Sequence, residues 1–264
     1  MKRERAFKDR PVSDIFSAYS IAGVATVESV AGGNLNSVVL HNFGLVSGGL
    51  EDFYGLDQGA AVRLGIDYGI SDRLSVGIGR TSREDNVDLR FKYTLLQQME
   101  SGKIPVQVVF KGDLGINTQK ENRFDFTFNE RLNYLGSVMI ARKWGDRIST
   151  QVTPMVSHFN TIIEEVPDVQ QYHTIYGLGL LARYKLSNKY SFSAEYLPVI
   201  GNRNEDTYDH IAVAFEINTG GHVFQIFAMS GNWFTEQHLL ARTNTNFLDL
   251  DFRLGFNINR VYKL

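Results

Sequence analysis

The sequence predicts an all-β protein: an antiparallel, up-and-down transmembrane β-barrel of about twelve strands, with short periplasmic turns and longer extracellular loops. Three observations carry this prediction. Apolar and polar residues alternate along most of the chain, the pattern of a strand with two different faces. Most of these segments reach the roughly 9–11 residues with which a tilted strand crosses a bilayer. Short and long connections also alternate, as they do in bacterial outer-membrane barrels.

The composition excludes several classes of protein. The chain has 264 residues, of which 43% are hydrophobic, a formal net charge of −2 and no cysteine. The lack of a basic surplus argues against a nucleic-acid binder. The lack of cysteine excludes a disulfide scaffold and a thiolate metal site. No apolar run reaches the roughly 18 residues of a transmembrane helix, so the sequence offers no such helix.

The amino-terminal region differs from the rest of the chain. Basic residues precede the uncharged stretch IFSAYSIAGVATV at 15–27, and this order resembles a secretory signal. Glu4 and Asp9 interrupt the basic part, however, so we expect a mature chain from which a signal was removed. We expect residues 1–30 to form a tail or a short plug segment and residues 31–264 to form the barrel.

The strands are justified by their period-2 pattern. In the segment 59–70, Leu64 and Ile66 share one face while Arg63 and Asp67 share the other. Amphipathic helices would need apolar residues spaced by three and four, which these segments lack. In chain order, we predict strands at roughly 35–46, 59–70, 73–81, 87–96, 104–117, 131–144, 147–159, 173–186, 189–198, 209–218, 221–230 and 247–262.

The connections between these strands fall into two groups. Tight turns are predicted around residues 71–73, 145–147, 187–189 and 219–221. Longer polar connections are predicted at 47–58, 118–130, 160–172, 199–208 and 231–246. If all tight turns lie on one side of the membrane, both chain ends lie there too, which in outer-membrane barrels is the periplasmic side.

The polar faces of the strands carry charges of both signs in equal numbers. A soluble barrel would point these charges outward, whereas a membrane barrel points them into its lumen and turns its apolar wall to lipid. The nearly continuous apolar face along a dozen long strands favours the membrane arrangement. The residues predicted to line a pore or to form a lumen network are Arg63, Asp67, Asp88, Arg90, Lys92, Lys111, Asp113, Arg183, Lys185, Glu195, Glu216, Asp249, Asp251 and Arg253.

Several motifs resemble an outer-membrane β-barrel family of the Bacteroidota that is known as a domain of unknown function. They are DRPVSD at 9–14, LNSVVLHNFG at 35–44, GGLEDFYGLDQGAAVRLGIDYGISDRLSVGIGR at 48–80, IARKWGDRIS at 140–149, TGGHVFQI at 219–226 and DFRLGFNINRVY at 251–262. The resemblance covers nearly the whole chain, and it is most specific at 48–80. It implies an outer-membrane barrel and a removed signal peptide, but no substrate and no catalytic residues.

The carboxyl-terminal segment of the chain suggests binding partners. Gly255, Phe256, Ile258 and Tyr262 resemble the carboxyl-terminal signal that the barrel-assembly machinery reads, and they also fit a plain last amphipathic strand. We therefore expect contacts with outer-membrane lipid and with that machinery during biogenesis, and we leave open an envelope protein partner. No nucleic-acid partner is expected.

Enzymatic and metal sites are not expected. A barrel phospholipase needs a serine with a neighbouring base, and none of the six histidines begins a His-x-Ser spacing. Asp209 and His210 fall where an omptin-like protease would place its groups, but adjacent strand residues point to opposite faces. The acidic loop residues Glu51, Asp52 and Asp57 fit a solvated turn better than a calcium loop. We predict no enzyme, no metal site and no cofactor.

Two functions remain open. One is a narrow pore for ions or small polar solutes, in which the charged residues of the lumen line a water-filled bore. The other is a closed structural or accessory barrel, an anchor or a partner-binding subunit of an outer-membrane complex, in which the same charges pair across strands. Balanced charge favours pairing, because selective pores often carry rings of one sign. The width of a bore enclosed by about twelve strands favours the presence of some water in the lumen, as a pore requires.

Overall fold

Each predicted strand segment contains a strand in the computed structural model, which describes residues 9–120, 125–162 and 170–264. Alternation therefore located the strands to within a few residues, except at the last one. The strands are β1 (Asn34–Leu45), β2 (Ala61–Gly69), β3 (Leu74–Thr81), β4 (Val87–Leu96), β5 (Gln107–Ile116), β6 (Leu132–Lys143), β7 (Ile148–Phe159), β8 (Thr174–Lys185), β9 (Tyr190–Leu197), β10 (Val199–Ile200), β11 (His210–Asn218), β12 (His222–Met229) and β13 (Arg253–Lys263).

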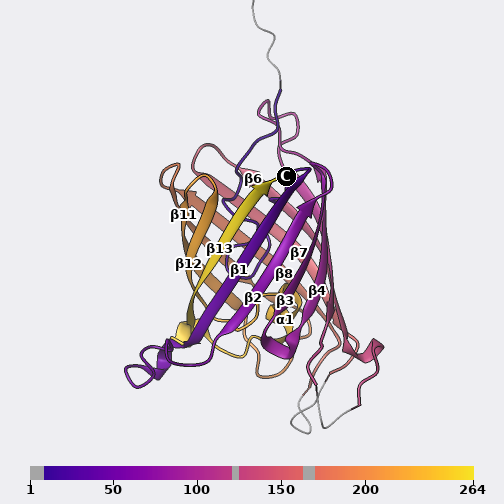
Figure 1. Ribbon diagram of the computed structural model, residues 1–264, viewed down its shortest axis with the longest axis vertical. Helices are drawn as coiled ribbons and strands as arrows, with labels where there is room; N and C mark the ends of the chain where they lie inside the picture. The colour runs from indigo at the N-terminus through magenta and orange to yellow at the C-terminus, as the bar shows by residue number, and fades with distance from the viewer. Residues whose placement is uncertain (1–8, 121–124, 163–169) are drawn as a thin grey trace, which may run out of the picture.

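The strands close into an antiparallel barrel (Figure 1). Neighbours in sequence pair with each other, and β13 pairs with β1 through a register that sets Val38 opposite Asn259. The two-residue strand β10 only prolongs the contact with β8, since β9 pairs with both β8 and β11. Of the 13 strands in the sheet, twelve therefore form the wall, as predicted.

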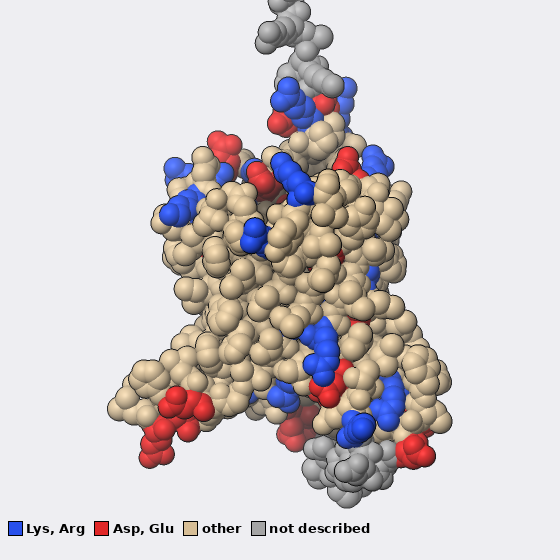
Figure 2. Space-filling model, in the orientation of Figure 1, with Lys and Arg blue, Asp and Glu red and all other residues tan. Residues whose placement is uncertain are grey.

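The wall has an apolar outside and a largely polar inside. On β2 the outward Leu64 and Ile66 are 57% and 49% exposed, whereas the inward Arg63 is 1% exposed. Figure 2 shows most charged atoms toward the two ends of the molecule, with a mostly uncharged band between them. This arrangement inverts that of a soluble barrel and matches a wall surrounded by lipid.

The tightest turns lie at one end of the barrel, which also holds the longer connection 97–106 between β4 and β5, and most of the long connections lie at the other end (Figure 1). The short-turn end holds the carboxyl terminus and the beginning of the described chain. The long-loop end holds the connections that follow β1, β5 and β12, among others. Among the described residues, no helix is long and apolar enough to cross a membrane.

The last strand begins later than the sequence predicts. Residues 247–252 are not strand, because Phe247–Asp249 form a 3₁₀ turn that the Asn246 side chain caps at the Leu248 amide. Leu250 follows with a left-handed φ of 64°, which ends any extended backbone. Asp249 and Asp251 therefore do not lie on the polar face of the last strand, where the alternation predicts them, but precede β13 at the long-loop end.

We predict that the cost of a charge on the outer wall depends on its depth. Ile78, in the middle of β3, and Ile70, at the short turn before it, are similarly exposed, at 51% and 54%. Ile78→Arg should lower the free energy of unfolding in lipid vesicles by about 2–4 kcal/mol, and Ile70→Arg by about 0–1 kcal/mol. Denaturant titration with heat-modifiable gel migration measures both. Equal costs would contradict a lipid-facing wall.

Candidate functional site in the barrel lumen

The barrel interior is occupied by the chain itself. Residues 15–30, here called the inner segment, run inside the wall ahead of β1. Ile15, Ile21, Val24 and Val27 are at most 1% exposed and belong to one apolar cluster with wall residues. The uncharged stretch that resembles a secretory signal is thus the filling of the lumen, since its small and apolar side chains pack there.

The inner segment has almost no ladder of its own. Its one bridge joins Ser20 and Ala25, and the Ile21 amide donates to the Val24 carbonyl at 3.1 Å. Buried backbone groups must nevertheless be hydrogen-bonded, because each one left unpaired costs free energy. The Thr26 amide also donates to the Tyr19 carbonyl at 3.0 Å, and most of the other partners come from the side chains of the wall.

Glu195, on β9, binds the tip of the inner segment. Its carboxylate accepts the amides of Ala22, Gly23 and Val24 at 3.3, 2.9 and 3.1 Å. His210 Nε2 of β11 lies 2.8 Å from the same carboxylate, and the Gly231 amide donates to His210 Nδ1 at 3.2 Å. One wall carboxylate thus satisfies three consecutive amides.

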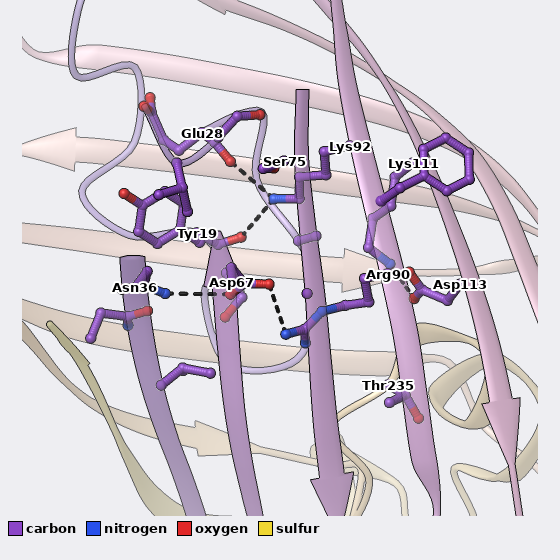
Figure 3. A pocket seen from close by; sticks show the side chains of 18 of the residues that line it. Tyr19, Glu28, Asn36, Asp67, Ser75, Arg90, Lys92, Lys111, Asp113 and Thr235 are labelled. Carbon is purple, nitrogen blue, oxygen red and sulfur yellow. Dashed lines mark hydrogen bonds and ion pairs between the residues drawn. The ribbon is translucent and has the colours of Figure 1, made fainter. Parts of the chain in front are cut away.

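Other wall side chains accept or donate along the rest of the inner segment. Gln151 accepts the Val27 amide and donates to the Ala25 carbonyl, both at 2.8 Å. Lys92 Nζ lies 3.0 to 3.3 Å from the carbonyl oxygens of Tyr19, Thr26 and Glu28 (Figure 3). Gln107, Arg183 and Gln225 donate to further carbonyls of residues 14–27. The polar side chains of the wall therefore bind the backbone of the inner segment.

A second insertion comes from the long-loop end. Residues 230–246, here called the inner loop, enter the lumen and contain α1 (Glu236–Arg242), most of which is buried. Glu236 accepts the Ala25 amide at 3.0 Å and pairs with Lys111 of β5, which also pairs with Asp113. Glu236 therefore joins the inner loop, the inner segment and the wall.

The tail that precedes the inner segment is fixed at the short-turn end. Pro11 bridges Met99 in the connection between β4 and β5, and the Val12 amide donates to the Gln98 carbonyl at 2.7 Å. Hydrogen bonds from the side chain and the amide of Ser101 lower the pKa of Asp9 against a small opposing effect of desolvation. This contact holds the place where the chain enters the barrel.

Several of the predicted lumen residues form ion pairs with one another. Arg63 pairs with Asp88, and Arg90 lies 2.8 Å from Asp67. Arg183 lies 3.7 Å from Glu216. Lys185 lies on the polar face near the short-turn end, and Arg253 lies inside the long-loop end with no carboxylate within ion-pair distance among the described residues. Sequence reasoning did not single out Gln151, Gln225 or Glu236, and it considered His210 only as a possible protease group, because alternation marks a polar face without saying what it faces.

Little space is left between the inner segment and strands β1 to β5. The cavity there is ≈ 60 Å³, and Asn36, Asp67, Ser75 and Arg90 are among its lining residues (Figure 3). At about 15 Å³ per water centre this is room for about four water molecules. The cavity has both polar and apolar side chains in its lining, and it is too small for a solute of metabolite size.

Solved porin structures are similar to the chain. A NanC porin has a TM-score of 0.57 at 7% identity, over 87% of this chain and 99% of that chain. The COG4313 outer membrane channel from Pseudomonas putida F1 has a TM-score of 0.54 at 14% identity, over 89% and 97%. A KdgM porin has a TM-score of 0.50 at 9% identity, over 88% and 99%. At such identities the likeness establishes the fold alone.

Sequence comparison gives one further match. Residues 16–262 match the family described as "Membrane bound beta barrel domain (DUF5777)". No curated protein sequence matches the chain. The family match includes nearly all of the inner segment together with the barrel.

We predict that Glu195 keeps the inner segment in place. Because the chain has no cysteine, Ala22→Cys introduces a single thiol at a fully buried position. A water-soluble maleimide should leave it unmodified in the otherwise native protein. Adding Glu195→Ala should raise the labelling rate about tenfold or more, since each buried amide without an acceptor costs about 1–3 kcal/mol.

Two controls belong to this measurement. Asn188→Cys, in an exposed turn, should react equally fast in both backgrounds. The exposed Glu51 provides the matched substitution, and Glu51→Ala should leave the Ala22→Cys thiol protected. Rapid labelling of Ala22→Cys without Glu195→Ala, in a barrel with native heat-modifiability, would contradict the described packing.

Proposed function

Because the chain belongs to the family of membrane-bound β-barrel domains (DUF5777), we propose that it is a plugged channel of the bacterial outer membrane. The inner segment is the plug, and ions or small polar solutes pass only when it is displaced. The observation that carries the proposal is the way the plug is held. Wall side chains such as Glu195 and Lys92 bind its backbone, and the wall ladders do not include it.

This mode of attachment suits a removable filling. The pairing of β13 with β1 closes the wall without any residue of the inner segment. When the plug leaves, the carboxylates, amides and ammonium groups that held it face a bore that water can enter. Twelve strands enclose a bore between those of eight-stranded filled barrels and 16-stranded porins. Arg90, Lys92 and Lys111 would then line the bore together with Asp67 and Asp113.

The orientation is part of the proposal. We place the short-turn end and both termini in the periplasm and the long connections outside the cell, as in outer-membrane barrels generally. The last strand, with Phe256, Ile258 and Tyr262 on the outer face, then presents the segment that the assembly machinery would read. A periplasmic envelope protein could reach the tail at Asp9–Val12, where the chain enters the barrel.

A closed accessory barrel is the second candidate. The inner loop favours this candidate. Glu236 connects the plug to Lys111, which also pairs with Asp113. The inner loop is also a second insertion, which would have to move before a solute could pass. In this alternative the barrel anchors a complex, and the lumen network only stabilises the fold. Neither candidate assigns catalysis to the chain.

Conductance in planar bilayers separates the two candidates. We predict that the native protein is silent and that Glu195→Ala combined with Gln151→Ala produces stable current steps, because four hydrogen bonds to the inner segment's amides and one to a carbonyl are lost. Glu51→Ala should remain silent. In the conducting variant, Arg90→Glu should shift the ion selectivity toward cations.

Two results would overturn the plugged channel. Stable current steps from the native protein would mean that the lumen is open at rest. Silence from the doubly substituted protein, with native heat-modifiability and a reactive thiol in Ala22→Cys, would mean that the released lumen does not conduct. That second result would favour the accessory barrel.

A further inference from the structure

The long-loop end of the lumen gathers arginines around one tryptophan. Trp233, in the inner loop, is 4% exposed. The Arg83 guanidinium lies 4.8 Å from the centre of its indole ring, and that of Arg242 lies 5.5 Å from the same centre. Arg83 comes from the turn between β3 and β4, and Arg242 ends α1. The inner loop and the turn between β3 and β4 therefore meet at this mouth.

Arg253 adds a further cation from the first residue of β13. It is 8% exposed, and its Nη1 donates to the Ser230 carbonyl at 3.0 Å and to Thr245 Oγ1 at 3.3 Å. Arg83 and Arg253 both contact the inner loop, Arg83 at Trp233 and Arg253 at Ser230 and Thr245, and the charge of Arg83 acts on Arg253. Both neutral acceptors of Arg253 lie in the inner loop, so its positive charge is not compensated there.

Most carboxylates of this region already form ion pairs with other arginines. Glu84 pairs with Arg242, and Asp88 pairs with Arg63. Asp251 acts on Arg253 through its charge, without an ion pair to it. Among the described residues, neither Arg83 nor Arg253 has a carboxylate within ion-pair distance. Two guanidinium groups thus lie near one another without a directly bonded counter-charge.

Burial and like charge both act on Arg83. Desolvation lowers the pKa of Arg83, the charge of Glu84 opposes this effect, and the charge of Arg242 lowers the pKa to a smaller extent. Even so, a guanidinium remains protonated at neutral pH. The favourable way to offset two neighbouring guanidinium charges is an anion, and the planar fork of arginine matches the oxygens of phosphate and carboxylate groups.

We propose that this mouth is a binding site for a small oxyanion, a phosphate or carboxylate group, held by Arg83 and Arg253 beside the indole of Trp233. Arg83 is exposed to solvent, so an anion can reach it from the long-loop end. Arg242, already paired with Glu84, orients the indole rather than binding the anion. The site goes beyond the plugged channel, because it needs no movement of the inner segment and can be tested in a silent barrel.

Trp233 provides the measurement. The chain has two tryptophans, and Trp144 lies on the outer wall with 60% of its surface exposed. In a Trp144→Phe protein in maltoside detergent, titration with inorganic phosphate at constant ionic strength should change the Trp233 fluorescence saturably. Chloride should not produce this change. Arg83→Gln should weaken the apparent affinity for phosphate about tenfold or more, since a charge-assisted hydrogen bond is lost.

The matched control is Arg80→Gln. Arg80 lies on the outer face of β3 close to the same turn, pairs with Asp85 and has a side chain that is 59% exposed. Its substitution should leave phosphate binding unchanged. Arg253→Gln should weaken binding as Arg83→Gln does, with native heat-modifiability confirming the fold. A fluorescence change that does not saturate, or one that is the same with chloride or in Arg83→Gln, would overturn the site.

A second arm identifies the source of the oxyanion. The titration is repeated in vesicles with and without lipopolysaccharide, whose phosphate groups lie at the outer surface. Saturation of the Trp233 signal by lipopolysaccharide before phosphate is added would identify a lipid phosphate as the occupant. An unchanged phosphate titration in both vesicles would identify a free anion. Absence of any response in both vesicles would overturn the proposal.

Discussion

The backbone of the inner segment has to be hydrogen-bonded in a lumen that holds little water, and much of the interior follows from this constraint. The segment forms no β-ladder with the wall, so many of its amides and carbonyls form hydrogen bonds with wall side chains. Glu195 accepts three consecutive amides, Gln151 bonds an amide and a carbonyl, and Lys92 serves three carbonyls. An aliphatic residue at any of these wall positions would leave buried polar groups unpaired, which is costly.

The same constraint explains why the lumen is polar although it is filled. A barrel packed only with side chains could use apolar layers, as small soluble barrels do. Here the filling presents backbone as well as apolar side chains, so the wall supplies both kinds of contact. Val109, Leu135 and Met139 pack in the apolar cluster, while Arg63 and Lys111 form ion pairs. The polar and apolar side chains on the inside of the wall therefore match the polar and apolar groups of the segment that fills the lumen.

The two insertions give the two ends of the barrel different chemistry. At the short-turn end, the backbone contact between Val12 and Gln98 and the hydrogen bonds of Ser101 to Asp9 hold the entering chain. At the long-loop end, the inner loop brings Trp233 and Arg242 to Arg83 and Arg253, which concentrates positive charge there. A barrel of near-zero net charge can thus hold a local group of arginines, because the sum over the chain conceals such groups.

The sequence by itself determined the wall. Period-2 alternation located the strands and separated Leu64 and Ile66 from Arg63, because each strand meets lipid on one side and the lumen on the other. It failed at residues 247–252, where Asn246 and Leu250 form a local turn that the alternating letters do not reveal. Only the tertiary structure decided what the polar face meets. Contacts such as those of Glu195 with Ala22, or Lys111 with Glu236, join residues more than a hundred positions apart, and no local periodicity encodes which distant backbone a side chain will bind.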